Sequence, residues 1–287
     1  MPHEHKILRV AFQGERGAFS EEAAVHLLGE KIETVPRPTF EALFSAIADG
    51  LADYVLAPIE NTLAGSVHKS YDLLLESNLR VVRETISPIV HNLIALPGAL
   101  FEQIASVESH PVALAQCESF FRAHPRIRRV ASLDTAGSVR DVMRAGDLSR
   151  AAIAGRRAAA IYGGQILREH LEDHRENWTR FLLLSTTPEI RQNADKLSLV
   201  LHLEHKPGAL KRALDVFAGR GINLLKIESR PIPGHPWEYR FYLDLQTPLG
   251  NAQTQQALEE LRTSARELRV LGCYPAHKSH TAEKANS

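Results

Sequence analysis

The pattern of apolar and polar positions changes once along the chain and predicts two regions of different architecture. From Ile7 to Ser185, short apolar or β-branched runs alternate with helical patterns, which is typical of βαβ units and a largely parallel sheet. Beyond the polar, proline-containing segment Thr186–Asp195, the predicted order is strand, helix, strand, strand, helix, strand. We therefore predict an α/β region followed by a ferredoxin-like βαββαβ domain.

The first predicted units are read in detail from their boundary residues. Ile7–Gln13 reads as a strand, Gly14–Gly17 as a tight turn, and Ser20–Leu28 as a helix capped by its own first hydroxyl. Thr39 is expected to cap a second helix, and Tyr54–Pro58 forms the next strand.

A second set of units follows and predicts a second lobe. It includes a helix from Pro111 to Ala123, and the apolar segment Asn177–Ser185 is expected to return to the first sheet. The predicted lobes are residues 6–84 with 172–187, and residues 85–171. Ligands of open α/β sheets bind at the carboxyl ends of strands, so we expect the site in a cleft between the lobes.

Composition and charge narrow the function classes. The chain of 287 residues has 34 Lys plus Arg against 34 Asp plus Glu, which argues against nucleic-acid or anionic-membrane partners. Met1–Lys6 is polar, and no apolar run approaches the length of a membrane span. Cys117 and Cys273 form no CxxC pair. We expect a soluble protein of the reducing cytoplasm.

Asn177-Trp178-Thr179-Arg180-Phe181 is the most specific of several linked motifs in the chain. It is similar to the Asn-x-Thr-Arg-Phe motif of the prephenate dehydratase family, including its arogenate dehydratase branch. The other motifs occur in the family's order at compatible spacings. They are Gly14 to Ser20, Pro58-Ile59-Glu60-Asn61-Thr62, Ser109-His110-Pro111 through Gln116-Cys117, Asp134-Thr135-Ala136-Gly137, Gly208-Ala209-Leu210, and Glu228-Ser229-Arg230-Pro231.

The resemblance implies a catalytic domain over residues 1–187, in two periplasmic-binding-protein-like lobes, and an ACT regulatory domain over 196–274. The tail, 275–287, is expected to be disordered. No chorismate mutase segment precedes Ile7, so the resemblance implies the monofunctional form. The implied enzyme is a carbon–oxygen lyase that converts prephenate to phenylpyruvate in phenylalanine biosynthesis. Arogenate as substrate, or both substrates, is the alternative, and a non-catalytic amino-acid-sensing protein is a remote one.

The resemblance also assigns residues to the reaction, for which we expect neither a metal nor an organic cofactor. Thr179 is implied as catalytic, Arg180 can offer a planar fork to a carboxylate, and Glu60 or His68 could supply the proton for the leaving hydroxyl. The predicted substrate-binding residues are Ser20, Asn61, Thr62, Thr135, Gly137 and Phe181.

Simpler interpretations remain open for several of these residues. Gly14 and Gly17 serve a tight turn equally well, and Asn61 with Thr62 could be a plain loop cap. For His110 and Cys117 we favour structural roles, as a turn residue and a buried thiol. Glu60 could instead accept backbone amides.

The C-terminal domain is expected to sense L-phenylalanine. The resemblance implies that two ACT domains associate and bind the amino acid at their interface. Without the resemblance, Glu228 and Arg230 would be interpreted as solvated charges on an edge strand. The predicted ligand-binding residues are Gly208, Ala209, Leu210, Asn223, Glu228, Ser229 and Arg230.

Overall fold

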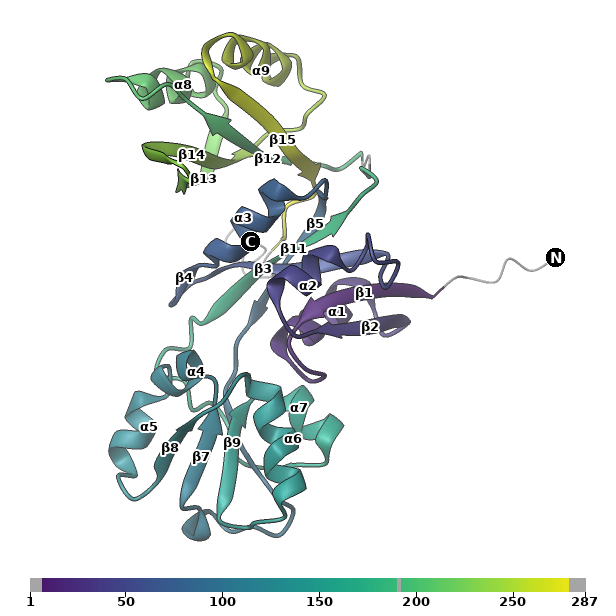
Figure 1. Cartoon of the computed structure of the whole chain (residues 1–287), viewed down its shortest axis with the longest axis vertical. Coiled ribbons are helices and arrows are strands. Elements are labelled where there is room, and N and C mark those ends of the chain that lie inside the picture. Colours follow the sequence, from purple (N-terminus) through teal and green to yellow (C-terminus); the bar gives the residue numbers. More distant parts are fainter. Residues whose placement is uncertain (1–6, 190–191, 279–287) are drawn as a thin grey trace, which may run out of the picture. The chain divides into compact units, whose positions relative to one another are not determined.

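The computed structural model describes residues 7–189 and 192–278, which form two compact units (Figure 1). Unit 1 comprises the chain up to Ser77 together with Thr85–Leu182, and unit 2 comprises Asn78–Glu84 and the chain from Leu183 onward. Most of the tail predicted to be disordered, from residue 279, lies outside the described residues.

The first lobe is built on a sheet of strand order β2-β1-β3-β11-β5, in which β5 and β11 each have residues in both units. β1 pairs in parallel with both β2 and β3, so the loops that follow β1 and β3 emerge at one edge of the sheet. β11 lies between β3 and β5, which places the segment from Trp178 in the first sheet, as the sequence predicts. The elements are β1 (Leu8–Gln13), α1 (Phe19–Leu28), β2 (Ile32–Arg37), α2 (Phe40–Ser45), β3 (Tyr54–Asn61), β4 (Gly65–Ser66), α3 (His68–Glu76), β5 (Arg80–Pro88) and β11 (Trp178–Ser185).

The second lobe has the sheet order β10-β6-β9-β7-β8, with helices on both faces (Figure 1). β7 is parallel to β8 and β9, whereas β6 is antiparallel to β9. The fully buried Leu93, Val107 and Ile153 belong to its core. The elements are β6 (Asn92–Ala95), the short 3-10 helix η1 (Phe101–Gln103), β7 (Ser106–Ser109), α4 (Pro111–Ala115), α5 (Glu118–Ala123), β8 (Arg128–Ala131), α6 (Thr135–Ala145), β9 (Arg150–Ala154), α7 (Arg156–Tyr162) and β10 (Gln165–Arg168).

Two local predictions are wrong, and both errors fall beside the cleft. Ser20 does not cap α1, because the helix starts at Phe19 with Ala18 as its extended N-cap and no side-chain cap. The helix predicted over Pro111–Ala123 is instead two helices, because Asp173, from a distant part of the chain, binds the backbone at the junction between them. Its backbone amide donates to the carbonyl of Gln116 at 2.8 Å, and its carboxylate accepts two amides at the start of α5. The strands β2, β4 and β10 and the helix α7 were not predicted.

Unit 2 contains the predicted ferredoxin-like domain, whose sheet has the order β13-β14-β12-β15 with α8 and α9 on one face (Figure 1). Leu199, Phe217, Leu243 and Leu258 are among its buried core residues. The elements are β12 (Lys196–His202), α8 (Ala209–Ala218), β13 (Asn223–Ile232), β14 (His235–Gln246), α9 (Ala252–Ser264) and β15 (Glu267–Tyr274).

The segment Asn78–Glu84 joins unit 2 through a buried ion pair and a close backbone approach. Lys196 Nζ lies 3.0 Å from Glu84 Oε1 and 2.9 Å from Oε2, and both side chains are buried. A Cβ at Gly272 would lie 2.1 Å from the carbonyl oxygen of Val81, so only glycine fits there. No helix in the described ranges is long and apolar enough to cross a membrane.

Candidate active site

A cavity of about 420 Å³ in unit 1 gathers side chains from both lobes. Its walls combine apolar groups with short polar ones, which is the usual make-up of a small-molecule site. The residues that line it are Gln13, Gly14, Ala18, Phe19, Ser20, Phe40, Pro58, Asn61, Ala64, Val67, Ile89, His91, His110, Val112, Ala113, Gln116, Leu133, Asp134, Thr135, Thr179 and Phe181.

The cavity includes five of the predicted site residues: Ser20, Asn61, Thr135, Thr179 and Phe181. Thr179 and Phe181 are alternate residues of β11 and share one face of the strand, so Arg180 between them belongs to the other face. Arg180 and Glu60 are not among the described lining residues, and the roles predicted for them remain predictions.

Asn61 fixes the polarity of the Thr179 hydroxyl. Its Oδ1 accepts the backbone amides of Leu63 at 3.0 Å and Ala64 at 2.8 Å, so its Nδ2 must be the donor end. Nδ2 donates to Thr179 Oγ1 at 3.0 Å. Because that oxygen already accepts a hydrogen bond, the hydroxyl hydrogen of Thr179 can be donated to a ligand. The loop-cap interpretation of Asn61 is therefore correct, and it operates together with the contact to Thr179.

Three further polar residues continue from Asn61 across the cleft. Asn61 Nδ2 donates to Asn177 Oδ1 at 2.8 Å, and Asn177 Nδ2 donates to Gln116 Oε1 at 2.9 Å. His91 Nε2 lies 2.8 Å from the same Gln116 oxygen. Sequence reasoning assigned none of His91, Gln116 and Asn177 to the site. Gln116 and Asn177 stand within the family motifs, which was a usable signal, whereas no local pattern marks His91.

The glycine turn after β1 is held against the second lobe. Gly17 has φ +87°, and a Cβ there would lie 2.7 Å from Cα of Ala158, so glycine serves both the turn and the close packing. Its amide donates to the buried carboxylate of Glu21 at 2.5 Å, and that carboxylate also lies 3.3 Å from the Arg157 guanidinium. Burial by itself would raise the pKa of Glu21, but the hydrogen bonds from Thr34 and Gly17 and the charge of Arg157 leave it lowered.

The described cavity wall includes no lysine or arginine, so neutral groups dominate its electrostatics. Asp134 is the one carboxyl residue among the described lining residues, and burial raises its pKa despite the hydrogen bond that it accepts from the Gly137 amide. Burial lowers the pKa of His91, which favours the neutral imidazole. Within residues 7–189 and 192–278, no group of three or more His, Cys, Asp or Glu side chains could hold a metal ion.

Two other predicted substrate-binding residues have structural contacts. The Thr62 hydroxyl donates to the carbonyl of Glu176 at 2.6 Å and accepts the amide of Trp178 at 2.9 Å, which ties β3 to β11. The Gly137 amide donates to the capping carboxylate of Asp134 at 2.6 Å. Neither residue is among the described lining residues, so substrate binding by either stays a prediction.

The structural roles favoured for His110 and Cys117 are confirmed. His110 Nδ1 accepts the amide of Val112 at 3.2 Å and caps α4, although the residue also lines the cavity. Cys117 is fully buried, and burial raises the pKa of its thiol well above the usual range. An un-ionised, inaccessible thiol is a poor nucleophile.

In unit 2, two of the predicted phenylalanine-binding residues border a small cavity. Gly208 is the N-cap of α8 with φ +76°, and Ala209 and Leu210 line a cavity of about 110 Å³ with Tyr239 and Phe241. The remaining predicted residues lie on β13, an edge strand on which exposed and half-buried positions alternate. There the Nδ2 of Asn223 donates to Gln246 Oε1 at 3.2 Å.

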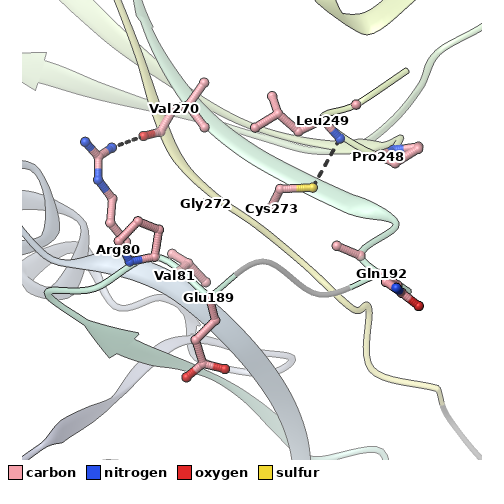
Figure 2. A pocket seen from close by; sticks show the side chains of 12 residues that line it. Arg80, Val81, Glu189, Gln192, Pro248, Leu249, Val270, Gly272 and Cys273 are labelled. Atoms are coloured by element: carbon pink, nitrogen blue, oxygen red, sulfur yellow. Dashed lines mark hydrogen bonds between the residues drawn. The ribbon is translucent and has the colours of Figure 1, made fainter. Parts of the chain in front are cut away.

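A larger cavity of about 470 Å³, also in unit 2, contains none of the predicted site residues (Figure 2). Two of the polar groups drawn there are hydrogen-bonded, because Arg80 donates to the carbonyl of Val270 and Cys273 Sγ accepts the amide of Leu249 at 3.3 Å. Burial raises the pKa of the Cys273 thiol, which keeps it protonated. Size alone therefore does not make this cavity the better candidate for chemistry.

Comparisons with known proteins show which family the chain belongs to. The chain is 42% identical over 284 residues to arogenate dehydratase/prephenate dehydratase 1 of Arabidopsis thaliana, covering 93% of this chain and 72% of that one. The prephenate dehydratase from Arthrobacter aurescens, solved in complex with L-Phe, has a TM-score of 0.86 and 32% identity and covers 94% of this chain and 90% of its own.

A second solved structure with a TM-score of 0.86 is described as GqqA, a novel type of quorum quenching acylases. It is 31% identical, and the alignment covers 96% of this chain and 99% of that one. The family model "Prephenate dehydratase" matches residues 10–189, and the model "ACT domain" matches residues 197–263. The predicted fold class is confirmed, and the chain belongs to the prephenate dehydratase family, with an ACT domain after its catalytic region.

Proposed function

We propose that this protein removes carbon dioxide and water from prephenate to give phenylpyruvate, with arogenate as the alternative substrate. The observation that carries the proposal is the Thr179 hydroxyl, buried in the cavity and polarised by Asn61 at 3.0 Å so that its hydrogen is available to a ligand. Such a donor suits the ring hydroxyl, which leaves as water. Aromatisation of the ring supplies the driving force.

Neutral donors hold the two substrate carboxylates in this proposal. Ser20 and Thr135 line the cavity from the first turns of α1 and α6, where the backbone amides of a helix are not used by the helix itself. Preorganised N–H and O–H dipoles stabilise charge in a site from which water is excluded. The ring carboxylate loses its stabilising water in the same site, which favours its departure as carbon dioxide.

The leaving hydroxyl also needs a proton, and Asp134 joins Glu60 and His68 as a candidate source. A carboxyl with a raised pKa is protonated over a wider pH range, and Asp134 lines the cavity. A general acid must be protonated, so the rate falls as pH rises through its pKa.

Comparing the pH–rate profiles of Asp134→Asn and Glu60→Gln tests the two carboxyl candidates. Loss of the alkaline decline in only one variant identifies the donor, and its persistence in both excludes both residues.

The proposed activity is tested by parallel turnover assays on prephenate and arogenate, with the wild type and Thr179→Val. Valine matches the shape of threonine but has no hydroxyl. We expect the wild type to convert at least one substrate and the variant to be much slower on that substrate. No conversion of either substrate by the wild type contradicts the proposal.

The similarity to a quorum quenching acylase does not lead us to propose acyl transfer. Acyl transfer by a hydroxyl requires a base that removes its proton. The Thr179 oxygen instead accepts a hydrogen bond from an amide N–H, which makes the oxygen less nucleophilic. The geometry therefore favours hydrogen-bond donation by Thr179 over nucleophilic attack.

For the ACT domain we propose feedback binding of L-phenylalanine at an interface between two copies. In one copy, Glu228, Ser229 and Arg230 lie on an edge strand, and the cavity beside Ala209 and Leu210 measures only about 110 Å³. A second copy would enclose the amino acid. Titration calorimetry with the full chain should show phenylalanine binding, and analytical ultracentrifugation should show a dimer or larger assembly. A monomer that binds no phenylalanine contradicts this proposal.

A further inference from the structure

The hydrogen-bond chain across the cleft has a direction that the backbone fixes. It begins where the amides of Leu63 and Ala64 donate to Asn61 Oδ1, so Asn61 can offer only its NH2 group to Asn177. Asn177 must then accept through Oδ1, which leaves its own NH2 to donate to Gln116 at 2.9 Å. The orientation of each amide thus follows from the one before it.

The same logic determines the tautomer of His91. Gln116 Oε1 accepts from Asn177, and an amide oxygen only accepts, so the His91 Nε2 that lies 2.8 Å away must carry a hydrogen. The other ring nitrogen, Nδ1, is buried and has no hydrogen-bond partner in the described part of the chain. A proton there would be a buried charge, so the ring is neutral and protonated at Nε2. The edge-to-face contact with Phe19, at 5.6 Å between ring centroids, holds it in place.

Two donors on one oxygen lock the Gln116 side chain. Since Oε1 is held by His91 and Asn177, the polar group that remains for a ligand is the NH2 group. Gln116 lines the cavity, whose described wall includes no lysine or arginine. An amide that turned its oxygen toward a dianion would repel it, so the lock decides whether Gln116 favours or opposes binding.

We propose that His91 is a positioning residue that, as the neutral Nε2–H tautomer, fixes Gln116 with its N–H donors toward the substrate carboxylates. This inference rests on the proposed dehydratase function. His91 lines the cavity, and the role proposed for it is exerted through Gln116. The competing interpretation is that His91 is an aromatic core residue whose nitrogens do not matter.

Kinetics of three variants separate these interpretations. Glutamine can place its Nε2 near the position of the histidine Nε2, asparagine is too short to do so, and leucine fills space without a donor. A donor that acts equally on bound substrate and transition state changes KM more than kcat. We expect His91→Leu and His91→Asn to raise KM by about tenfold or more, and His91→Gln to stay within about threefold of wild type. His26→Gln, on the exposed side of α1, is the control.

The outcomes are distinguishable from failure of the dehydratase proposal. If the wild type converts neither prephenate nor arogenate, the proposed function fails and this inference falls with it. If the wild type is active while folded His91→Leu keeps its KM, only the role of His91 is overturned. Rescue by glutamine but not asparagine supports the lock, and equal losses in both folded variants contradict it.

Nitrogen-15 NMR of the histidine-labelled, ligand-free protein tests the lock without turnover. The His91 signal, assigned by its absence in His91→Gln, should show a protonated Nε2 and an unprotonated Nδ1 at neutral pH. A hydrogen on Nδ1 and none on Nε2 would overturn the inference, because the orientation derived from Asn61 would then be wrong. An imidazolium would overturn it as well, because the inference requires the neutral ring.

Discussion

The cleft of unit 1 and the ligand motifs of unit 2 differ in how complete they are within one chain. In the cleft, polar side chains from two lobes meet around about 420 Å³ and are ordered by Asn61, Asn177 and Gln116. In unit 2, the motif residues border about 110 Å³ or lie on an edge strand. The catalytic site is therefore preorganised by the fold, whereas the sensing site awaits a second copy in our proposal.

The two units also treat charge differently. The described wall of the cleft has neutral donors and one carboxyl with a raised pKa, so a dianion would meet little fixed charge. Unit 2 instead buries the Lys196–Glu84 ion pair, which a third hydrogen bond, from the amide of His277 at 2.8 Å, supports. In unit 2 each buried charge is neutralised by its partner in the Lys196–Glu84 pair, whereas the charge in an occupied cleft would come mainly from the ligand.

The largest expected effect comes from removing the Thr179 hydroxyl in the cleft of unit 1. Thr179→Val should lower kcat by roughly 10²- to 10⁴-fold, because the positioned hydrogen-bond donor to the leaving hydroxyl is lost while the shape is kept. Steady-state kinetics on prephenate and arogenate measures the loss. Phenylalanine binding, followed by calorimetry, should be unchanged because the sensing residues lie in unit 2. A loss of kcat below about fivefold would contradict the role of Thr179.

The next effect concerns the buried charge in unit 2. Lys196→Met should lower the free energy of unfolding by about 3–5 kcal/mol, because the Glu84 carboxylate would be left buried without its cation. Urea denaturation followed by circular dichroism measures it.

The control is Lys211→Met, which removes an exposed ion pair with Asp215 on α8 and should cost at most about 0.5 kcal/mol. Equal losses in Lys196→Met and Lys211→Met would show that burial of the first pair does not matter.

A smaller effect sharpens the account of the sensing site. Gly208→Ala and Gly221→Ala both place a side chain at positive φ, +76° and +66°, and each should cost about 1 kcal/mol of stability. Only Gly208 belongs to the predicted phenylalanine motif. We expect calorimetry to show about tenfold weaker phenylalanine binding for Gly208→Ala alone. Equal weakening in both variants would mean that backbone strain, rather than the local site, explains the loss.

The sequence predicted the parts of this molecule that local patterns determine. Alternating strands and helices, the βαββαβ order and the cap at Thr39, which accepts the Ala42 amide at 3.2 Å, all follow from residues close in the chain. Ser20 and Thr135 follow strands of the predicted sheets, and the structure brings both to the cavity.

What the sequence did not reveal depends on contacts between distant residues. Asp173 caps α5 from more than 50 residues away at the break between α4 and α5, and Gln116, which lines the cavity, lies at that break. His91 has no motif around it, and its role follows only from a hydrogen bond to Gln116, 25 residues later in the chain. Local propensity carries no information about either contact.

The smallest expected effect tests whether the cleft is as neutral as the comparison requires. Burial raises the pKa of Asp134, so the folded protein holds this proton to higher pH than the unfolded chain does. The stability from this group is therefore fully present below the unfolded pKa, near 3.9, and is lost as pH rises through the raised value. Asparagine caps a helix as well as aspartate does but does not titrate.

Between about pH 4 and pH 7, the melting temperature of the wild type should therefore fall relative to that of Asp134→Asn as the pH rises. If the wild type instead gained stability over the variant with rising pH, Asp134 would be held as a carboxylate. Its negative charge would then oppose a dianionic substrate, and the cleft would resemble unit 2, where a carboxylate is held by its partners. If the melting temperature of the wild type instead falls relative to that of Asp134→Asn, the only carboxyl in the described wall tends toward a neutral donor. Asp134 would then differ from Glu84, whose carboxyl group is paired with a buried lysine.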